Sequence, residues 1–407
     1  MTALKRLRIL ELAGDVAGEY CGKLVADFGA EVIKIEAPGL GSATRRRAPL
    51  CRSGAPQERS ALFAYLNTNK RSVTLDLAAP RGREILLRLA GTVDALIDDH
   101  PKGYLEGLGL DPGECGHRHP GLVICSVTPF GYEAPAELQR ACSLNVFQSS
   151  GWGYHTPSDP DPGTPPLKGA GRFLTDYESG LSAAIALVAA LYFKSGSGRG
   201  QFVDVSEQAS LASLSDYVLG QMVAGHMDVN TKRSAFDLGG PATFFQCRDG
   251  YVYLFMTEPG HWNGLYRLMG EPPWMLEFPE RWLELHLTPE RIQRCRMQIA
   301  QWMKSQERVD VATRAQKLGV ALVPVNTVKD VLESPQLQHR KYFVELDHPT
   351  LGRSKYPTVP YQFSRTPARL EAHAPLLGQH TEQVLGAVAG IGPPSAGTLH
   401  EPGVIRR

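Results

Sequence analysis

The first 130 residues alternate between short apolar runs and segments of helical spacing, and this alternation most constrains the fold. Residues 7–13 (LRILELA) are expected to form a buried strand, 17–31 a helix that ends at Gly29, and 31–37 (EVIKIEA) a second strand. Two strands joined through one helix lie parallel in a sheet, with a right-handed crossover. The opening of the chain therefore predicts a β-α-β unit.

The same pattern recurs along the next hundred residues. It predicts further elements in the order strand, helix, strand, strand, at 72–77, 80–91, 93–99 and 122–131. Repeated alternation of this kind is typical of an open α/β sheet with parallel strands. The run 13–20 has small residues at the place of a dinucleotide-binding turn, but no GxGxxG, so it gives a dinucleotide cofactor only weak support.

The character of the sequence changes near residue 226 and returns near residue 330. Between these points, residues 251–256 (YVYLFM) alternate like an antiparallel strand, and residues 261–318 have mostly helical spacing. This stretch predicts a smaller α+β domain. Elsewhere we expect a proline-rich loop at 156–168, a long helix at 206–225 and a helical tail at 378–388, and a strand followed by a helix at 321–337 crosses the second boundary.

Composition excludes several classes of protein. The 407 residues include 43 Lys and Arg against 42 Asp and Glu, which gives no reason to expect a nucleic acid or an anionic membrane as partner. No run approaches about 18 apolar residues, and the N-terminus lacks the apolar stretch of a signal peptide. The seven cysteines form no CxxC pair, which favours reduced thiols in a cytoplasmic protein. The histidines share no metal-binding spacing, so no metal site is predicted.

Asp176 stands directly before a Gly- and Ala-rich apolar run that predicts a buried helix. One interpretation is a helix N-cap, which contributes about 1 kcal/mol to stability. The other is a carboxylate nucleophile, which attacks an acyl group better when it is partly desolvated and aimed by a helix N-terminus. The local sequence leaves both open, and one residue can serve both purposes.

Two basic clusters lie near the ends of predicted strands. Thr44–Arg47 follows the second strand, and Asn69–Arg71 precedes the third. Ligands of α/β sheets bind at strand ends, and Arg pairs bidentately with phosphate oxygens. Each cluster is therefore a candidate anion site or a solvated surface patch. The pair Gly239–Gly240 is a mobile loop or a plain turn.

Five segments, in this order, resemble the class III CoA-transferases of the carnitine and bile-acid type. They are spread over nearly the whole length of the chain and are LRILELAGDVAGEYCGKLVADFGAEVIKIEAPGLGSATR (7–45), LNTNKRSVTLDL (66–77), VDALIDDHPKGYLEGLGL (93–110), LTDYESGLSAAIALVAALYFKSGSGRGQFVDVS (174–206) and LLGQHTEQVL (376–385).

The resemblance implies that Asp176 is the nucleophile of an acyl-CoA:carboxylate CoA-transferase. Asp176 would form a mixed anhydride with the donor acyl group, then an aspartyl-CoA thioester, and pass CoA to the acceptor acid. The substrates would be an acyl-CoA and a carboxylic acid, with no tightly bound cofactor. An aspartate of pKa about 4 is ionised at neutral pH and needs no general base.

The resemblance also implies the CoA contacts and the assembly. The CoA-binding positions that match are Val16, Ala17, Arg45, Arg71, Leu75, Ala78, Asp99, His100 and Arg140. The sequence departs from the family at Asp98-Asp99-His100, where Glu-Asn-Phe is usual, and in its short glycine loop. Family members are interlocked homodimers whose Rossmann-like domain, here 1–225 plus 330–407, is built from both termini around an inserted small domain, here 226–329.

Two other functions remain open. An α-methylacyl-CoA racemase shares this fold, but it needs a histidine in the segment 140–151, where this chain has Cys142 and its nearest histidine is His155. A CoA-binding protein without catalysis is the second alternative. Aromatic side chains expected near the acyl pocket favour a bulky apolar acid, and they are Trp152, Tyr154, Phe244, Phe245 and Trp262.

Overall fold

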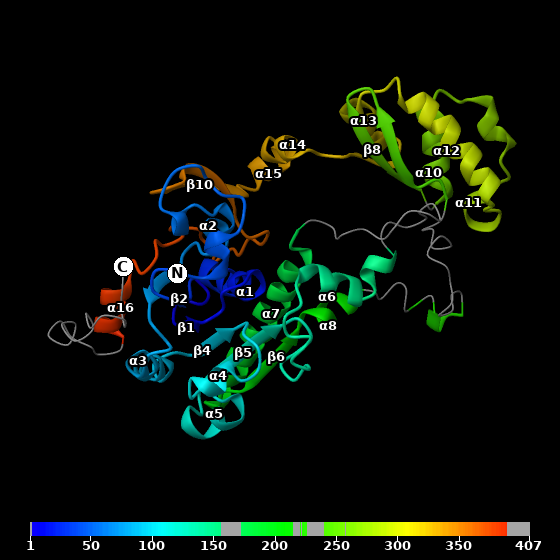
Figure 1. Cartoon of the computed structure of the whole chain (residues 1–407). Coiled ribbons are helices and arrows are strands. Elements are labelled where there is room, and N and C mark those ends of the chain that lie inside the picture. The colour runs from blue at the N-terminus through cyan, green and yellow to red at the C-terminus, as the bar shows by residue number, and fades with distance from the viewer. Residues whose placement is uncertain are drawn as a thin grey trace. The chain divides into compact units, whose positions relative to one another are not determined.

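The computed structural model (Figure 1) describes residues 2–155, 172–214, 220, 222–225, 240–256 and 258–388. These residues form two compact units. The first contains the N-terminal part of the chain through residue 225, together with residues 339–388. The second contains residues 240–338. Each unit has its own hydrophobic core.

The first unit is built on a parallel sheet, as the sequence predicted, and this sheet has six strands in the described residues. Its strand order is β3-β2-β1-β4-β5-β6, so the direction of winding reverses between β1 and β4. In open sheets of this kind, ligands bind at the carboxyl ends of the strands on either side of that reversal. The strands are β1 Arg8–Glu11, β2 Glu31–Glu36, β3 Arg71–Thr74, β4 Ala95–Asp98, β5 Val123–Thr128 and β6 Phe202–Ser206.

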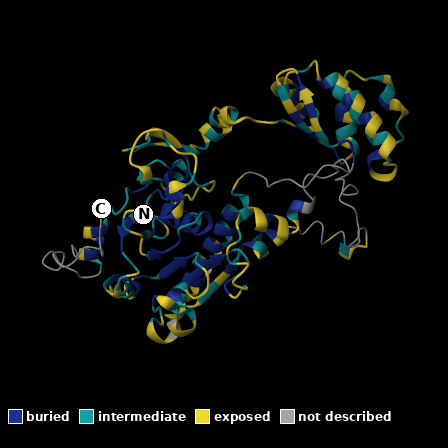
Figure 2. Ribbon diagram, viewed as in Figure 1, coloured by how far each residue is buried: buried dark blue, intermediate teal, exposed yellow. Residues whose placement is uncertain are grey.

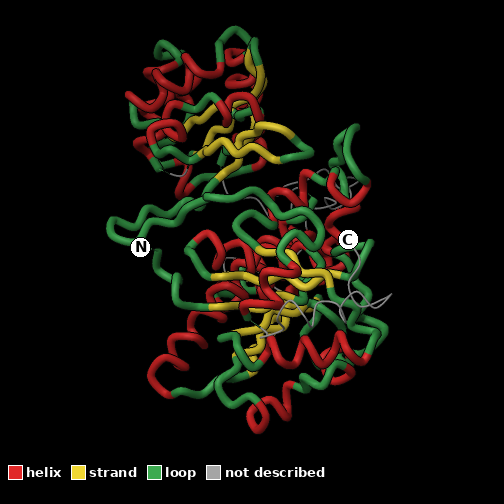
Figure 3. Tube along the Cα trace, turned by 90° about the vertical axis from the view of Figure 1, so that its left-hand side faces the viewer, coloured by secondary structure: helices red, strands yellow, loops and turns green. Residues whose placement is uncertain are grey.

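Helices cover both faces of this sheet, which lies between them in Figure 3. Successive strand residues point to opposite faces, so Ile9 belongs to one core cluster and Leu10 to the other. The first cluster packs under α1 (Val16–Asp27) and α7 (Leu174–Ser197). The second packs under α3 (Pro80–Ala90), α4 (Tyr104–Gly107) and α16 (Thr381–Ala387). Figure 2 shows the strands as the most continuously buried part of this unit.

Shorter helices lie in the connections of the first unit. They are η1 Ala43–Arg46, η2 Pro56–Glu58, α2 Ala61–Leu66, α5 Pro112–Arg118, α6 Ser143–Ser149, η3 Trp152–His155 and α8 Glu207–Ala212. The helix predicted at 206–225 begins as α8, and part of its remainder lies outside the described residues. The proline-rich segment 156–168 lies outside them entirely.

The C-terminal segment completes the edge of the parallel sheet. The backbone N–H of Gly378 donates to Ser72 Oγ at 2.9 Å, and that of Thr74 donates to Thr381 Oγ1 at 3.0 Å. A hairpin of β10 (Phe343–His348) and β11 (Gly352–Pro357) precedes this segment. Residues more than 300 positions apart therefore build one unit.

The second unit has a small antiparallel sheet in the order β7-β8-β9, covered by helices. The strand predicted at 251–256 and the helices predicted within 261–318 are confirmed. The elements are β7 Thr243–Cys247, β8 Gly250–Phe255, α10 Pro259–Leu268, η5 Pro273–Glu277, α11 Trp282–Leu285, α12 Pro289–Met303, α13 Arg308–Lys317 and β9 Ala321–Pro324, after which α14 Val328–Leu332 and α15 Pro335–His339 follow.

Two of the aromatic side chains expected near an acyl pocket belong instead to the core of this second unit. Phe245 is buried, and Trp262 packs edge-on against Trp282 with ring centroids 5.0 Å apart. The antiparallel sheet needs these large rings to close its small core against α10. Phe244, on the opposite face of β7, is exposed.

Helix α7 is the predicted apolar helix, but it is buried on one face only. Ala183 and Leu187 pack against the sheet, whereas Ile185 and Tyr192 on the other face are 64% and 81% exposed. Its length and composition meet the criteria for a membrane span, although 39% of its most apolar window is buried in the protein. The core helix of a soluble protein meets the same criteria. The sequence expectation that the chain has no transmembrane helix therefore stays a prediction.

Candidate active site

Asp176 is the third residue of α7, in its first turn. The helix begins two residues earlier, and its N-cap is Phe173, which makes no side-chain capping bond. The N-cap interpretation is therefore wrong. The carboxylate still accepts a hydrogen bond from its own backbone N–H, and a helix N-terminus stabilises negative charge in this turn. Only 6% of the residue is exposed.

The groups around Asp176 shift the pKa of its carboxyl in opposite directions. Burial raises the pKa of the carboxyl, and the nearby charge of Asp15 adds to this. A hydrogen bond with Ser143, at the start of α6, and the positive charge of Arg47 lower it. Its Oδ2 atom is buried and has no hydrogen-bond partner among the described residues. A desolvated carboxylate oxygen without a partner has its lone pairs available to attack a carbonyl carbon.

The turn after β1 approaches Asp176 at the reversal of the sheet. Asp99, just beyond β4, accepts hydrogen bonds from the backbone N–H groups of Gly14 at 3.0 Å and Asp15 at 2.7 Å. These bonds fix the turn that leads into Val16, the first residue of α1. Burial raises the pKa of Asp99 to about 6, and the neighbouring charges of Asp98 and Asp15 add to this.

An apolar wall lies beside Asp176 and joins α7 to α1 and α2. Tyr177 packs edge-on against Tyr20, with ring centroids 4.9 Å apart, and near Tyr65 at 6.3 Å. The wall contains Val16, Leu62 and Leu66, with Tyr20, Tyr65, Phe173 and Tyr177 packed around them. The nucleophile candidate and two predicted CoA-contact residues, Val16 and Ala17, therefore lie in one region, since Ala17 also borders α7 at Gly180.

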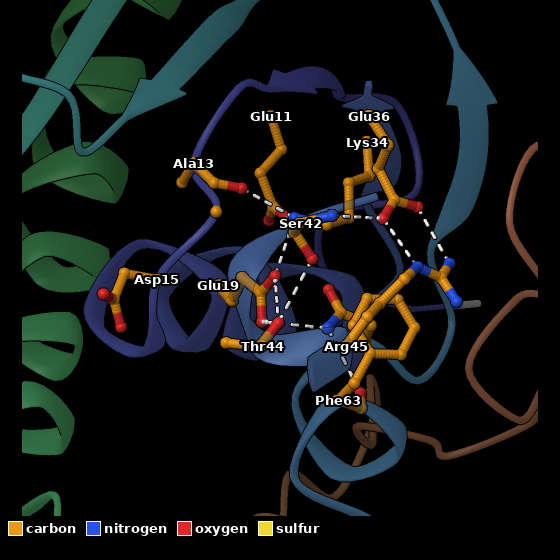
Figure 4. A network of polar contacts seen from close by, with 12 residues as sticks. Glu11, Ala13, Asp15, Glu19, Lys34, Glu36, Ser42, Thr44, Arg45 and Phe63 are labelled. Carbon is orange, nitrogen blue, oxygen red and sulfur yellow. Dashed lines mark hydrogen bonds and ion pairs between the residues drawn. The ribbon is translucent and has the colours of Figure 1, made fainter. Parts of the chain in front are cut away.

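A buried network of ion pairs supports the turn after β1 (Figure 4). Lys34 on β2 lies 3.0 Å from Glu11 and 2.9 Å from Glu19, and its ammonium group donates to the carbonyl oxygen of Ala13 at 2.6 Å. Burial alone would lower the pKa of Lys34, but the two carboxylates raise it above its usual value. Lys70 completes the network at 2.8 Å from Glu11.

Arg45 belongs to this internal framework and does not lie on a ligand surface. It is 0% exposed, it pairs with Glu36 at 2.7 Å and Glu58 at 2.9 Å, and its guanidinium carbon lies 3.7 Å from the ring centroid of Phe63. Burial by itself would raise the pKa of Glu36, but the hydrogen bond and positive charge of Arg45 outweigh this effect and lower the pKa to about 2. Arg45 therefore has no accessible N–H group for a phosphate, contrary to the sequence expectation.

Arg47 is the basic residue of the same cluster that reaches Asp176. It is half-buried and forms an ion pair with Asp15, through both guanidinium N–H groups. Burial opposes its charge, but Asp15 and then Asp176 raise its pKa. Sequence reasoning chose Arg45 from this cluster and not Arg47, because a run of three arginines does not show which side chain turns inward.

The remaining predicted contact residues are divided between the two ends of the sheet. His100 lies beside Asp99 and stacks on Tyr104 at 3.7 Å. Ala78 is exposed beyond the carboxyl end of β3, whereas Leu75 is a core residue. Arg71 begins β3 at the amino end and pairs with Glu31 at 2.8 Å, so it lies away from Asp176. Arg140 is exposed ahead of α6.

Parts of the expected site lie outside the described residues. They include Gly239 and the side chains of Tyr154 and His155. Cys142 is exposed at the N-terminus of α6, next to Ser143. Ser143 was not selected from the sequence, because a single serine without a GxSxG or similar pattern carries no signal.

The sequence of residues 4–381 matches the family described as CoA-transferase family III. The chain belongs to this family. Among its relatives, this CoA-transferase is 29% identical to the formyl-CoA:oxalate CoA-transferase of Bradyrhizobium diazoefficiens, over 99% of this chain and 97% of that protein. It is 31% identical to the succinyl-CoA:(R)-benzylsuccinate CoA-transferase subunit BbsE of Thauera aromatica, over 93% of each chain.

Solved structures agree with this assignment. The CoA-transferase superimposes on a CaiB/BaiF family protein from Brucella suis with a TM-score of 0.79 and 26% identity, over 95% of this chain and 99% of that one. The family predicted from five sequence segments is thus confirmed, as are the α/β fold and the class of enzyme. The protein transfers CoA between an acyl-CoA and a carboxylate.

Proposed function

We propose that Asp176 is the nucleophile of this CoA-transferase and that it carries CoA covalently between donor and acceptor. The observation that supports this most strongly is the buried Oδ2 of Asp176, which has no hydrogen-bond partner in the described part of the chain and lies where the sheet reverses. The backbone N–H of Asp176 and the hydroxyl of Ser143 donate hydrogen bonds to the other carboxylate oxygen. One oxygen is thus oriented and the other is free to react.

The reaction proceeds in four steps without net proton transfer. The Asp176 carboxylate attacks the thioester carbonyl carbon of the donor, and the carbon–sulfur bond breaks to release CoA thiolate. The thiolate attacks the aspartyl carbonyl carbon of this anhydride, which releases the donor acid and leaves aspartyl-CoA. The acceptor carboxylate then displaces the thiolate, which finally attacks the acceptor carbonyl and restores Asp176. Hydrogen-bond donors aimed at the tetrahedral carbon's oxygen lower each barrier.

The CoA substrate is proposed to lie along the carboxyl ends of β1, β4 and β3. Val16, Ala17, Asp99 and His100 border this edge beside Asp176, and Ala78 lies beyond β3. Arg47 and the exposed Arg140 are the candidates for phosphate or carboxylate contacts. We infer that CoA is a substrate here and that no cofactor is bound tightly.

The protein is further proposed to act as a homodimer in the cytoplasm, with the second unit as the inserted small domain. The exposed apolar face of α7 supports the dimer, because an exposed patch of this kind usually marks a protein contact. The relatives act on formyl-CoA with oxalate and on succinyl-CoA with benzylsuccinate, so small and bulky acids both belong in the substrate test.

The proposal is tested by measuring CoA transfer from a panel of acyl-CoA donors to a panel of carboxylic acids. Asp176→Asn should lower the rate by about 10³-fold or more. Asp310→Asn, at an exposed carboxylate in the second unit, should leave it unchanged. Full transfer by Asp176→Asn would contradict the mechanism. Deuterium exchange at C2 of a 2-methylacyl-CoA, without an acceptor acid, would favour the racemase instead.

A further inference from the structure

A second buried carboxyl group, that of Glu207, lies at the same end of the sheet as Asp176. Glu207 is the first residue of α8, directly after β6, and is 7% exposed. The sequence places it there because the Ser206 hydroxyl accepts a hydrogen bond from the backbone N–H of Ala209 and begins the helix. Neither the sequence motifs nor the proposed mechanism uses Glu207.

Among the described residues, the charged groups that act on Glu207 are all acidic. Its helix packs against α7, α6 and β6. The negative charge of Asp176 on α7 acts on Glu207. So do the negative charges of Asp15 and Asp99, which lie in the turns after β1 and β4. Helix α6 has no titratable residue. The carboxylate of Asp204 on β6 accepts a hydrogen bond from the backbone N–H of Tyr132.

Glu207 has none of the supports that Asp176 has. Asp176 is stabilised as an anion by Ser143, by its own backbone N–H and by Arg47. Among the residues that the structure describes, the side chain of Glu207 has no hydrogen bond, ion pair or neighbouring positive charge. Burial and then the charge of Asp176 raise the pKa of Glu207 well above its ordinary value.

Two buried carboxyl groups do not both ionise readily when their negative charges repel each other. Of the two groups, Glu207 has less support for its negative charge, so it holds a proton more readily than Asp176 does. Environments that make the pKa values of two neighbouring carboxyl groups differ in this way assign the two groups different chemical roles.

No group of three or more His, Cys, Asp or Glu side chains in the described part of the chain is arranged to hold a metal.

We propose that Glu207 is a second functional carboxyl group of this site, which stays protonated and donates a hydrogen bond to the negative oxygen that forms on the thioester carbonyl. This role rests on the proposed attack by Asp176. As the Asp176 oxygen bonds to the carbonyl carbon, the C=O electron pair moves onto the carbonyl oxygen. The O–H of Glu207 donates to this oxygen without giving up its proton. The oxyanion then collapses and expels CoA thiolate.

The test compares Glu207→Met with Glu207→Gln in the full-length protein. The quantity measured is the rate at which an acyl-CoA donor labels Asp176 in a rapid-quench reaction. The methionine variant cannot donate and should label Asp176 about 100-fold more slowly, the usual loss for one oxyanion donor. The glutamine variant keeps an N–H donor and should stay within about tenfold of the wild-type rate. Donor affinity should change little in either variant.

The pH profile separates this role from a merely structural one. Because the pKa of Glu207 is raised, Glu207 is neutral below that pKa and becomes an anion as pH rises through it. The wild-type labelling rate should therefore fall at alkaline pH, and Glu207→Gln should remove that fall. This comparison decides the matter even where Glu207→Met does not fold.

Glu178→Gln is the matched control, since Glu178 lies two residues beyond Asp176 in α7 and so points about 200° around the helix from it. It should keep the wild-type rate and pH profile. A wild-type rate in a folded Glu207→Met, or an alkaline fall that persists in Glu207→Gln, would overturn the role of Glu207 while leaving Asp176 as nucleophile. Failure of the wild-type protein to label at Asp176 would overturn both proposals.

Discussion

Lys34 carries a full charge in the interior of the protein, and its position depends on the two carboxylates that it bridges. Glu11 and Glu19 lie within 3.0 Å of its ammonium group, and all three side chains are fully buried. Removing one partner from a buried ion pair leaves an uncompensated charge. The backbone of Ala13 would also lose a donor, so both stability and the turn beside the active site depend on this lysine.

Lys34→Met should therefore lower the free energy of unfolding by about 3–5 kcal/mol, as measured by chemical denaturation. Arg81→Met, which breaks an exposed pair with Glu84, should change it by less than about 1 kcal/mol. Equal losses in the two variants would show that the buried network does not carry the stability assigned to it.

Helix α7 connects the nucleophile candidate to the rest of the fold through one close approach to α1. A Cβ atom on Gly180 would lie 2.5 Å from the carbonyl oxygen of Ala17 and 3.1 Å from the side chain of Tyr20. Only glycine allows the two helices to lie this close. The same contact sets the distance between Asp176, one turn earlier, and the start of α1.

Gly180→Ala should therefore force α1 and α7 apart, lower the free energy of unfolding by about 1–3 kcal/mol and reduce CoA transfer. Gly196→Ala is its control on the same helix. A Cβ there meets nothing within 4 Å, so the substitution should raise stability by roughly 0.5–1 kcal/mol through helix propensity. Thermal unfolding and activity measurements of both variants test the difference, and an equally stable Gly180→Ala would contradict it.

The exposed face of α7 raises the question of what covers it in the whole protein. Ile185, Val188, Tyr192 and Phe193 together form an apolar surface on a helix whose other face is packed. In the proposed homodimer a second copy buries this face.

Tyr192→Glu should then shift the protein from dimer to monomer in analytical ultracentrifugation, because an unpaired carboxylate would be buried at the contact. Tyr192→Phe, which keeps the ring, should remain dimeric. A dimer that is as stable with glutamate as with tyrosine would show that α7 does not form the contact.

The sequence could predict most of the fold of the whole molecule, because alternation and burial are local signals. The strands at 7–13 and 31–37 were visible as apolar runs, and their parallel pairing followed from the single helix between them. The sequence did not show that one side of α7 is exposed. An apolar helix covered by another chain has the same composition as one covered by its own chain.

The candidate site could be predicted only in part, because it depends on which side chains turn inward. Asp176 was selected through its motif and its position directly before an apolar run. Arg45 was preferred to Arg47, although burial and ion pairing separate them clearly in the structure. Glu207 was missed, because the absence of a cation beside it among the described residues is a three-dimensional property.

The central claim is that Asp176 becomes covalently modified during CoA transfer. Its most direct test is mass spectrometry of the protein quenched during turnover with an acyl-CoA donor, with hydroxylamine added in parallel to trap activated carboxyl groups. We expect an acyl or CoA adduct, and a hydroxamate after trapping, on the peptide that contains Asp176, and neither on Asp176→Asn. Transfer that proceeds while Asp176 stays unmodified would contradict the account.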